Sequence, residues 1–266
     1  MPVMRTIERP RRVRRQTTRP AAWRVAVGVL GSLVCLGALG AVSFAFYGYL
    51  QTAPRYRVQQ VDIEGNARTS DAAIRAVAGL DDAPPLLFLD LDAVAARISR
   101  MPLIDACRVE RALPDRVRVI VQERQPVATL LVHNRLFELD CEGVVLAELD
   151  AAAPHVGPLI TGAAGLGVLE PGDALQHRAV REALALWAAY RDTPLGQETT
   201  VSEIVARAPN DLRMYCNELP FEMRWGRIDY ALQAQRLNHL WAQRRTDLES
   251  CAAYVDLRFE DQLACR

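Results

Sequence analysis

The longest apolar pattern in this chain is an uncharged run between Arg24 and Arg55. Its hydrophobic part, Val25 to Leu50, is 26 residues long. A helix needs about 20 apolar residues to cross a bilayer, so the run predicts one transmembrane helix, which we place at 23–50. Aromatic residues at both ends of the run are typical of side chains at the membrane surface.

Charge is distributed unevenly about this run. Eight arginines and a single acid, Glu8, precede it, so the first 24 residues carry a net charge of +7 and the remainder carries −7. Basic residues beside a span stay cytoplasmic, which predicts a cytoplasmic N-terminus and places 51–266 outside the membrane. The polar segment 1–22 has no periodicity and is predicted to be a disordered tail.

A cleaved signal peptide is the alternative to a retained anchor. Its apolar region would span about 7–15 residues and end at a small-residue cleavage site. The run in this chain is longer, and Gln51-Thr52-Ala53-Pro54 matches such a site poorly. A retained anchor is therefore the favoured interpretation.

From Arg57 onward the pattern changes to short alternating and helical segments. Val61 and Ile63 alternate with polar residues and precede the turn signal Gly65-Asn66, which predicts a strand. Thr69-Ser70-Asp71 and Asp90 can each cap the start of a helix. The pattern then predicts two helices and two strands, at 71–79, 91–101, 109–113 and 117–121. The order is strand, helix, helix, strand, strand.

The second half of the outer portion also mixes strand and helix patterns. Apolar segments on both sides of Gly143 predict a hairpin over 136–146. Helical spacing predicts two amphipathic helices, at 181–191 and from Tyr230 to Trp241. The last predicted element is a strand from Tyr254 to Cys265. Because nothing follows it in sequence, its edge is expected to be open.

Cysteine usage leaves two possibilities open. Of the six cysteines, Cys35 lies in the predicted span and five lie outside it. A bridge between Cys251 and Cys265 is compatible with two neighbouring strands, and buried free thiols are equally compatible. The spacing fits no CxxC or Cys–His metal motif.

Patterns that would indicate an enzyme are weak. Three glycines miss the spacing of a dinucleotide loop: Gly162, Gly165 and Gly167. The four histidines are far apart in sequence, so no metal site is predicted. Glu138, Asp140 and Glu142 could bring carboxylates together, but solvated turn acids explain them better than a glycosidase pair. We expect no cofactor, no small-molecule substrate and no nucleic-acid partner.

The motifs together resemble one known family. The order strand, helix, helix, strand, strand resembles a POTRA domain, and the residues are similar to the bacterial cell-division family FtsQ/DivIB. The resemblance is carried by VQQVDIEGNARTS at 58–70, LFLDLD at 87–92, MPLIDACRVERALPDRVRVIVQERQPVA at 101–128 and YVDLRF at 254–259. The hairpin at 136–146 is also similar, whereas 158–162 matches loosely.

The resemblance implies an α+β fold with a single N-terminal transmembrane helix. A POTRA domain (β-α-α-β-β) at 55–125 would be followed by a mixed C-terminal β domain at 126–266, whose sheet is largely antiparallel. The implied function is that of a non-enzymatic scaffold of the divisome in the cell inner (cytoplasmic) membrane at the septum. Its implied partners are FtsB- and FtsL-type proteins, which in the family dock on the final strand.

Carried to this sequence, the resemblance implies a contact set in the last predicted strand: Arg258, Phe259, Glu260, Asp261, Gln262 and Leu263. A partner segment could join an open sheet edge as an extra strand. Phe259 is expected to supply apolar contact and Arg258 to pair with an acid of the partner. Phe259 and Leu263 could instead face the core of the domain.

Two other classes of function remain open at this point. One is a membrane-anchored envelope hydrolase with an unrecognised site. The other is a POTRA accessory of protein transport, although further POTRA repeats are missing from the sequence.

Overall fold

The computed structural model describes residues 22–226, 229–249, 251, 253–259 and 264–265. The chain divides into two units, Met1–Tyr56 and Arg57–Arg266. In the first unit, α1 (Ala22–Thr52) is followed by the short turn η1 (Pro54–Tyr56). The predicted tail lies outside the described residues, apart from Ala22.

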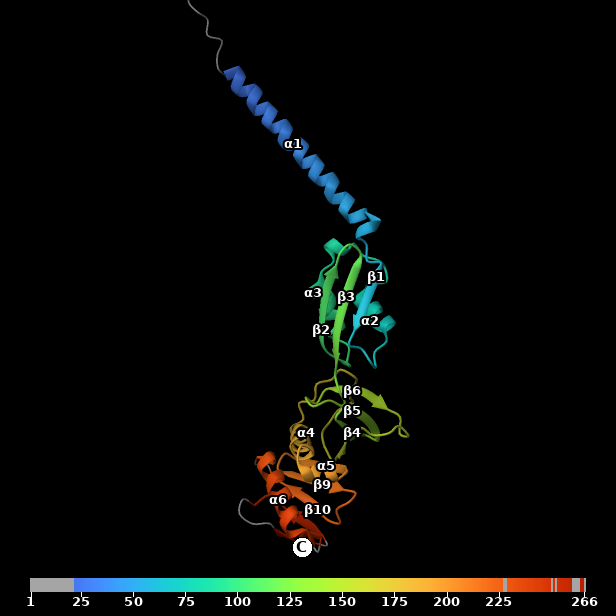
Figure 1. Ribbon diagram of the computed structural model, residues 1–266, viewed down its shortest axis with the longest axis vertical. Helices are drawn as coiled ribbons and strands as arrows, with labels where there is room; N and C mark the ends of the chain where they lie inside the picture. The colour runs from blue at the N-terminus through green and yellow to red at the C-terminus, as the bar shows by residue number, and fades with distance from the viewer. Residues whose placement is uncertain (1–21, 227–228, 250, 252, 260–263, 266) are drawn as a thin grey trace, which may run out of the picture. The chain divides into compact units, whose positions relative to one another are not determined.

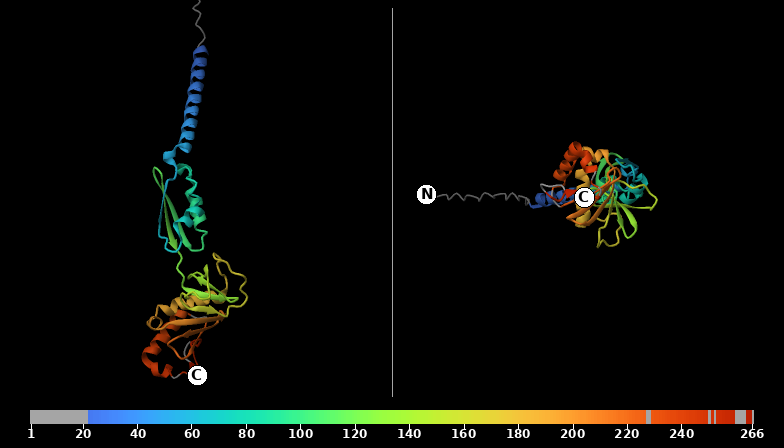
Figure 2. Two further views of the ribbon diagram at one scale, coloured as in Figure 1. Left: turned by 90° about the vertical axis from the view of Figure 1, so that its right-hand side faces the viewer. Right: turned by 90° about the horizontal axis from the view of Figure 1, so that it is seen from below.

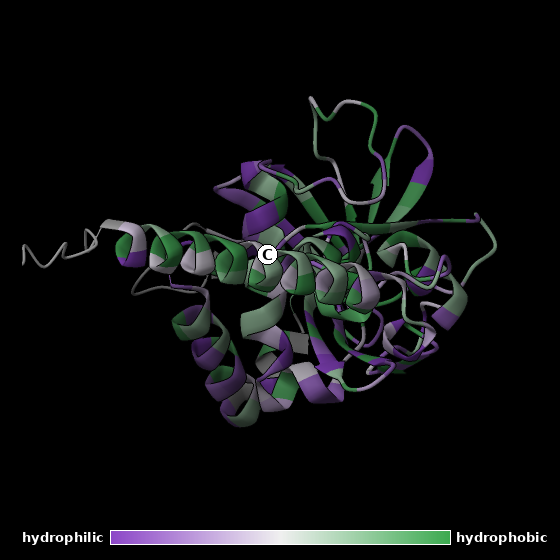
Figure 3. Cartoon of the chain, turned by 90° about the horizontal axis from the view of Figure 1, so that it is seen from above, coloured by the Kyte–Doolittle hydropathy of each residue, from purple (hydrophilic) through white to green (hydrophobic). Residues whose placement is uncertain are grey.

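Helix α1 has the length and composition needed to cross a membrane. Its segment Trp23–Thr52 is 30 residues long and contains an 18-residue stretch with a mean hydropathy of 2.3, none of which is buried. Figure 3 shows hydrophobic colouring along most of this helix. The helix therefore suggests a membrane anchor, as the uncharged run predicts.

The second unit begins with a three-stranded sheet and two helices. Its elements are β1 (Gln60–Glu64), α2 (Asp71–Ala78), η2 (Leu86–Phe88), α3 (Leu91–Ile98), β2 (Ile104–Ala112) and β3 (Arg116–Glu123). The strand order is β1-β3-β2, with β1 parallel and β2 antiparallel to β3. Both helices lie on the same face of the sheet (Figures 1 and 2). The predicted β-α-α-β-β order is confirmed.

Local side-chain chemistry sets the ends of these helices. The Ser70 hydroxyl accepts the backbone N–H of Ala73 at 3.2 Å, and the Asp90 carboxylate accepts that of Ala93 at 3.0 Å. Gly79 ends α2 with φ +68, a left-handed conformation that is costly for other residues. The caps predicted from the sequence are therefore the ones used.

A nine-stranded mixed sheet forms the rest of this unit. Its strands are β4 (Ala128–Val132), β5 (Arg135–Leu139), β6 (Val145–Leu149), β7 (Leu159–Thr161), β8 (Val201–Ala208), β9 (Asp211–Cys216), β10 (Glu222–Trp225), β11 (Tyr254–Asp256) and β12 (Ala264–Cys265). Their order is β12-β11-β10-β9-β8-β7-β4-β5-β6. The helices are α4 (Arg178–Arg191), α5 (Pro194–Glu198) and α6 (Tyr230–Glu249). This agrees with the expected α+β class.

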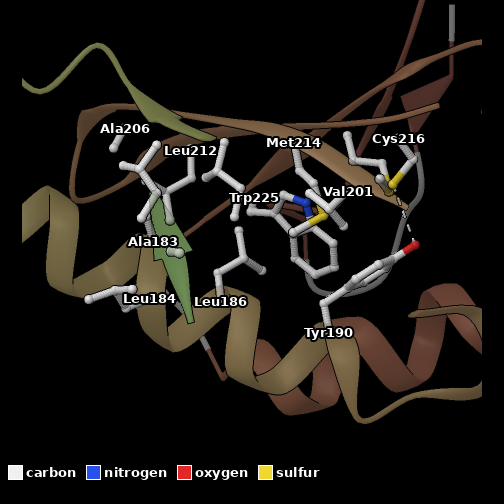
Figure 4. Close-up of a cluster of buried hydrophobic side chains, with 14 of the residues drawn as sticks. Ala183, Leu184, Leu186, Tyr190, Val201, Ala206, Leu212, Met214, Cys216 and Trp225 are labelled. Carbon is white, nitrogen blue, oxygen red and sulfur yellow. Dashed lines mark hydrogen bonds between the residues drawn. The ribbon is translucent and has the colours of Figure 1, made fainter. Parts of the chain in front are cut away.

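The core of the nine-stranded unit lies between the sheet and helix α4. Helix α4 packs across β8 and against α6. At the centre of the close-up in Figure 4, the rings of Tyr190 and Trp225 meet edge to face, with centroids 6.1 Å apart. Both side chains are fully buried, so they anchor β10 firmly to α4.

Candidate functional site

One end of the described nine-stranded sheet is formed by β12, the last strand in the sequence. Strand β11 pairs in parallel with β10 on one side and antiparallel with β12 on the other. The expectation of one strand from Tyr254 to Cys265 is therefore wrong: two short strands occupy this stretch. It also follows that β11 is covered, and that β12 is the outermost strand at this end among the described residues.

A side-chain contact explains why the chain leaves β11 after three residues. The Asp256 carboxylate accepts the backbone N–H of Arg258 at 3.1 Å, a contact between residues two apart that favours a turn. The same carboxylate accepts the Arg258 guanidinium through Nε at 2.9 Å and Nη2 at 2.6 Å. These bonds turn the backbone away from the strand direction.

The described part of the predicted contact set lies just after this turn. Phe259 is 55 % exposed, so its side chain does not fill the core. The Arg258 guanidinium is already paired with Asp256 within the chain, rather than left for a partner acid. The remaining predicted residues, Glu260, Asp261, Gln262 and Leu263, lie outside the described residues.

A network of charged and tyrosine side chains covers one face of the neighbouring strands. Glu222 accepts hydrogen bonds from the Tyr215 hydroxyl at 2.5 Å and from Arg224 at 2.6 Å. The Arg224 guanidinium lies 3.7 Å from the centre of the Tyr254 ring. Sequence reasoning missed this network, although the alternation of polar residues in 211–216 and 222–225 could have indicated it.

The opposite face of the same strands carries apolar side chains that are buried in the core. Val255 is fully buried and Leu257 is 5 % exposed. Cys251, three residues before β11, is buried and disulfide-bonded. The side chain of Cys265, the bridge partner considered from the sequence, lies outside those that the structure describes. Among the described side chains, four cysteines are free thiols: Cys35, Cys107, Cys141 and Cys216.

The charges of this network are stabilised in their ionised forms. Burial alone would raise the pKa of Asp256, but hydrogen bonds from Arg258 and the charges of Arg258 and Arg224 outweigh it and lower that pKa. Burial also opposes ionisation of Glu222, yet Tyr215 and the arginines lower its pKa below its usual value. The turn after β11 therefore depends on a charged Asp256.

Replacing Asp256 by Asn is expected to destabilise the nine-stranded unit at neutral pH. A hydrogen bond to a charged group contributes about 1.5–3 kcal/mol, and the 39 % exposure of the Arg258 side chain favours the lower end. Because the folded pKa of Asp256 is lowered, this stabilisation is present above about pH 4 and is lost as the pH falls further. Urea unfolding of both proteins between pH 7 and pH 2 checks this. A stability difference that stays constant over that range contradicts it.

The other end of the sheet, at β6, is partly covered. Val144 bridges to Ala174, the Val145 N–H donates to the Asp173 carbonyl, and the Gly172 N–H donates to the Val145 carbonyl. An exposed ion pair between Arg135 and Glu148 lies on β5 and β6. Charged side chains and a covering loop are ways in which proteins protect sheet edges. Among the described residues, by contrast, no segment pairs with the outer side of β12.

The acids that could have formed a catalytic pair are engaged elsewhere. Glu138 accepts a hydrogen bond from Arg68 at 2.6 Å. Asp140 and Glu142 both pair with Arg124, at 2.5 and 2.9 Å. Within the part of the chain that the structure describes, no group of three or more His, Cys, Asp or Glu residues could hold a metal ion.

Two families of known proteins match this chain over most of its length. A family described as "POTRA domain, FtsQ-type" matches residues 56–124. A second family, "Cell division protein FtsQ/DivIB, C-terminal", matches residues 128–258. Together the two matches cover both sheets up to the turn at Arg258.

Relatives similar to this chain share one printed name, "Cell division protein FtsQ". The protein of Koribacter versatilis is 32 % identical over 256 residues, covering 90 % of this chain and 69 % of its own length. That of Myxococcus fulvus is 30 % identical over 212 residues, covering 80 % and 73 %. That of Syntrophotalea carbinolica is 27 % identical over 246 residues, covering 91 % and 86 %.

The family accounts for the lack of recognisable catalytic motifs, because its members are division proteins rather than enzymes. It also accounts for the apolar helix and for the two sheets in this order. Two family models match successive parts of the chain, and two relatives are 30 % and 32 % identical over more than two thirds of both chains, so this chain belongs to the FtsQ/DivIB family of bacterial cell-division proteins.

Proposed function

We propose that this division protein is a membrane-anchored scaffold that recruits partners through the open edge at β12. Its domains would be the tail at 1–22, the transmembrane helix at 23–50, the POTRA domain at 55–125 and the C-terminal domain at 126–266. The N-terminus would be cytoplasmic and both folded domains periplasmic, in the inner membrane at the division septum. The arginine-rich start of the chain supports this orientation.

Two observations carry the proposal together: β12 is a two-residue edge strand, and Phe259, three residues after β11, is exposed. The Leu257 N–H donates to the Arg224 carbonyl in β10, so the backbone of Asp256 points the other way, toward β12. Asp256 is opposite Ala264, which leaves the N–H and C=O of Cys265 directed to the free side. An extended partner segment could pair with these groups and place an apolar side chain on Phe259.

Partners of this kind fit the family. FtsB- and FtsL-type proteins are expected to bind here, the first through an added strand and the second together with it. Rigid pairing of β11 with β10, and the burial of Val255 and Leu257 beneath it, supply the fixed platform that strand addition needs. Depletion of the protein in living cells is expected to give filaments without septa.

A proline placed in the edge strand tests strand addition. Ala264→Pro removes a backbone N–H from β12 and breaks its pairing with β11, so we expect recovery of FtsB-type partners with the detergent-solubilised full chain to fall at least about tenfold. The matched control is Ala147→Pro, which places the same change in β6 at the other end of the sheet. Equal recovery with Ala264→Pro and the unmodified chain would rule out docking at β12.

A further inference from the structure

The connection between the two sheets is short and polar. Strand β3 ends at Glu123 and β4 begins at Ala128, so four residues join them. The buried apolar residues form two separate clusters, one for each sheet. Domains that share no large apolar interface are expected to move relative to each other. Something other than hydrophobic packing must therefore hold the POTRA domain against the C-terminal domain.

Arg124, directly after β3, makes the first link. Its guanidinium lies 3.1 Å from Asp105 in β2 of the POTRA domain, 2.5 Å from Asp140 and 2.9 Å from Glu142. The Asp140 side chain is only 3 % exposed, and its second oxygen accepts the N–H groups of Glu142 and Val144 at 2.9 and 2.7 Å. The backbone of the hairpin turn thus holds the Asp140 carboxylate in place, independently of its ion pair with Arg124.

Arg68 makes the second link, from the loop between β1 and α2. Its Nη2 donates to the Glu138 carboxylate in β5 at 2.6 Å, and the Glu138 side chain is 7 % exposed. The loop that carries Arg68 is itself fixed, because Glu123 accepts the backbone N–H groups of Arg68 and Thr69 at 2.9 and 2.8 Å. Two independent arginines therefore reach acids of the C-terminal domain.

We propose that Arg68 and Arg124 form an ionic clamp that sets the orientation of the POTRA domain on the C-terminal domain. Both arginines belong to the POTRA domain or directly follow its last strand. The acids that they pair with, Glu138, Asp140 and Glu142, all lie in the β5–β6 hairpin. The arrangement has only one alignment in which both arginines are satisfied, because each acid is fixed on a strand or turn.

Burial makes this clamp stronger than a surface ion pair. Glu138 and Asp140 are almost removed from water, so the loss of either arginine leaves a carboxylate without its counter-charge. The alternative alignments of the two domains all carry that cost. The clamp therefore positions the docking edge relative to the POTRA domain, a role that does not depend on which partner binds at β12.

A distance measurement between the two domains tests the clamp. Spin labels carried on unnatural amino acids replace Val77 in α2 and Val168 in the C-terminal domain, which are 40 % and 78 % exposed, in the full chain in lipid nanodiscs. The unmodified protein is expected to give one narrow distance distribution. In the double variant Arg68→Gln/Arg124→Gln, the distribution is expected to broaden roughly twofold and shift.

The matched control is Arg135→Gln, which breaks an ion pair inside the C-terminal domain. It is expected to leave the distribution unchanged, and equal broadening in this control would overturn the proposal. An unchanged width in the double variant, with both domains folded by circular dichroism, would overturn it as well.

An exchange of charge keeps the test decisive if the double variant folds poorly. Arg68→Glu alone is expected to broaden the distribution, and adding Glu138→Arg is expected to restore its width. A purely structural loss would not be rescued in this way. Failure of the exchange to restore the width would show that these two residues do not set the orientation.

Discussion

Replacing Phe259 by Asp is expected to weaken binding of the partner segment strongly. Phe259 is an exposed aromatic residue three residues after β11, and the side chain of a binding anchor commonly contributes about 2 kcal/mol or more. Introducing a charge there adds a desolvation penalty, so we expect affinity to fall at least about thirtyfold. Titration of the purified full chain with an FtsB-type periplasmic segment measures this directly.

Two further variants separate this effect from general damage. Phe259→Leu keeps an apolar surface and is expected to retain most of the affinity. Val168→Asp places the same charge at a residue that is 78 % exposed on the same domain, and is expected to bind as the unmodified chain does. Thermal unfolding should be the same for all, because Phe259 does not fill the core. Full affinity in Phe259→Asp would place the contact elsewhere.

Replacing Gly65 by Ala is expected to destabilise the POTRA domain strongly. Gly65 has φ +90, and a Cβ at this position would lie 2.0 Å from the backbone oxygen of Val121 in β3. A side chain in this conformation costs about 1–2 kcal/mol, and an overlap with backbone adds about 1–3 kcal/mol. The sum is a large part of the stability of a domain of this size. The loss of stability is measured by urea unfolding, with hydrogen exchange of residues 57–123 as the readout for this domain.

Two other glycines separate the cost of the backbone conformation from the cost of the contact with Val121. Gly165 has φ +86 with open space around it, so Gly165→Ala reports the cost of the backbone conformation alone. Gly167 has open space and no such conformation, so Gly167→Ala is expected to be close to neutral. If Gly65→Ala and Gly165→Ala cost the same, contact with Val121 would not be the cause.

The POTRA half of the fold could be predicted from sequence because its signals are local. Ser70 and Asp90 cap the helices that follow them, and Val117, Val119 and Val121 alternate along β3 without interruption and are all buried. Each of these signals is contained in fewer than ten residues. The exception is β2, which begins at Ile104 rather than Val109 because its register shifts between Ile104 and Ala106.

The C-terminal half was less predictable for a physical reason. Strand β8 contains two irregularities in its pairing with β9, at Val201/Glu203 and at Ala206/Ala208. Each shifts the register by one residue, which breaks the alternation that indicates a strand. Strands β7 and β10 have only three and four residues, too few to show a period.

The candidate site shows the same limit. The contact set carried over from the family includes Arg258 and Phe259, and the exposure of Phe259 agrees with a surface role. The hydrogen bonds between Asp256 and Arg258, which divide the expected strand, depend on side-chain direction rather than on hydrophobic pattern. Likewise, Arg68 and Glu138 are 70 residues apart in sequence, so their pairing depends on how the two sheets meet.

The unequal ends of the nine-stranded sheet have a consequence for stoichiometry. At β6 the backbone is partly covered by residues 172–174 and flanked by the Arg135–Glu148 pair, whereas no strand among the described residues pairs with the outer side of β12. A sheet with two free ends could pair directly with two further strands, whereas a sheet with one free end has a single place for direct pairing, next to β12. Binding at this edge should therefore saturate at one partner segment per chain.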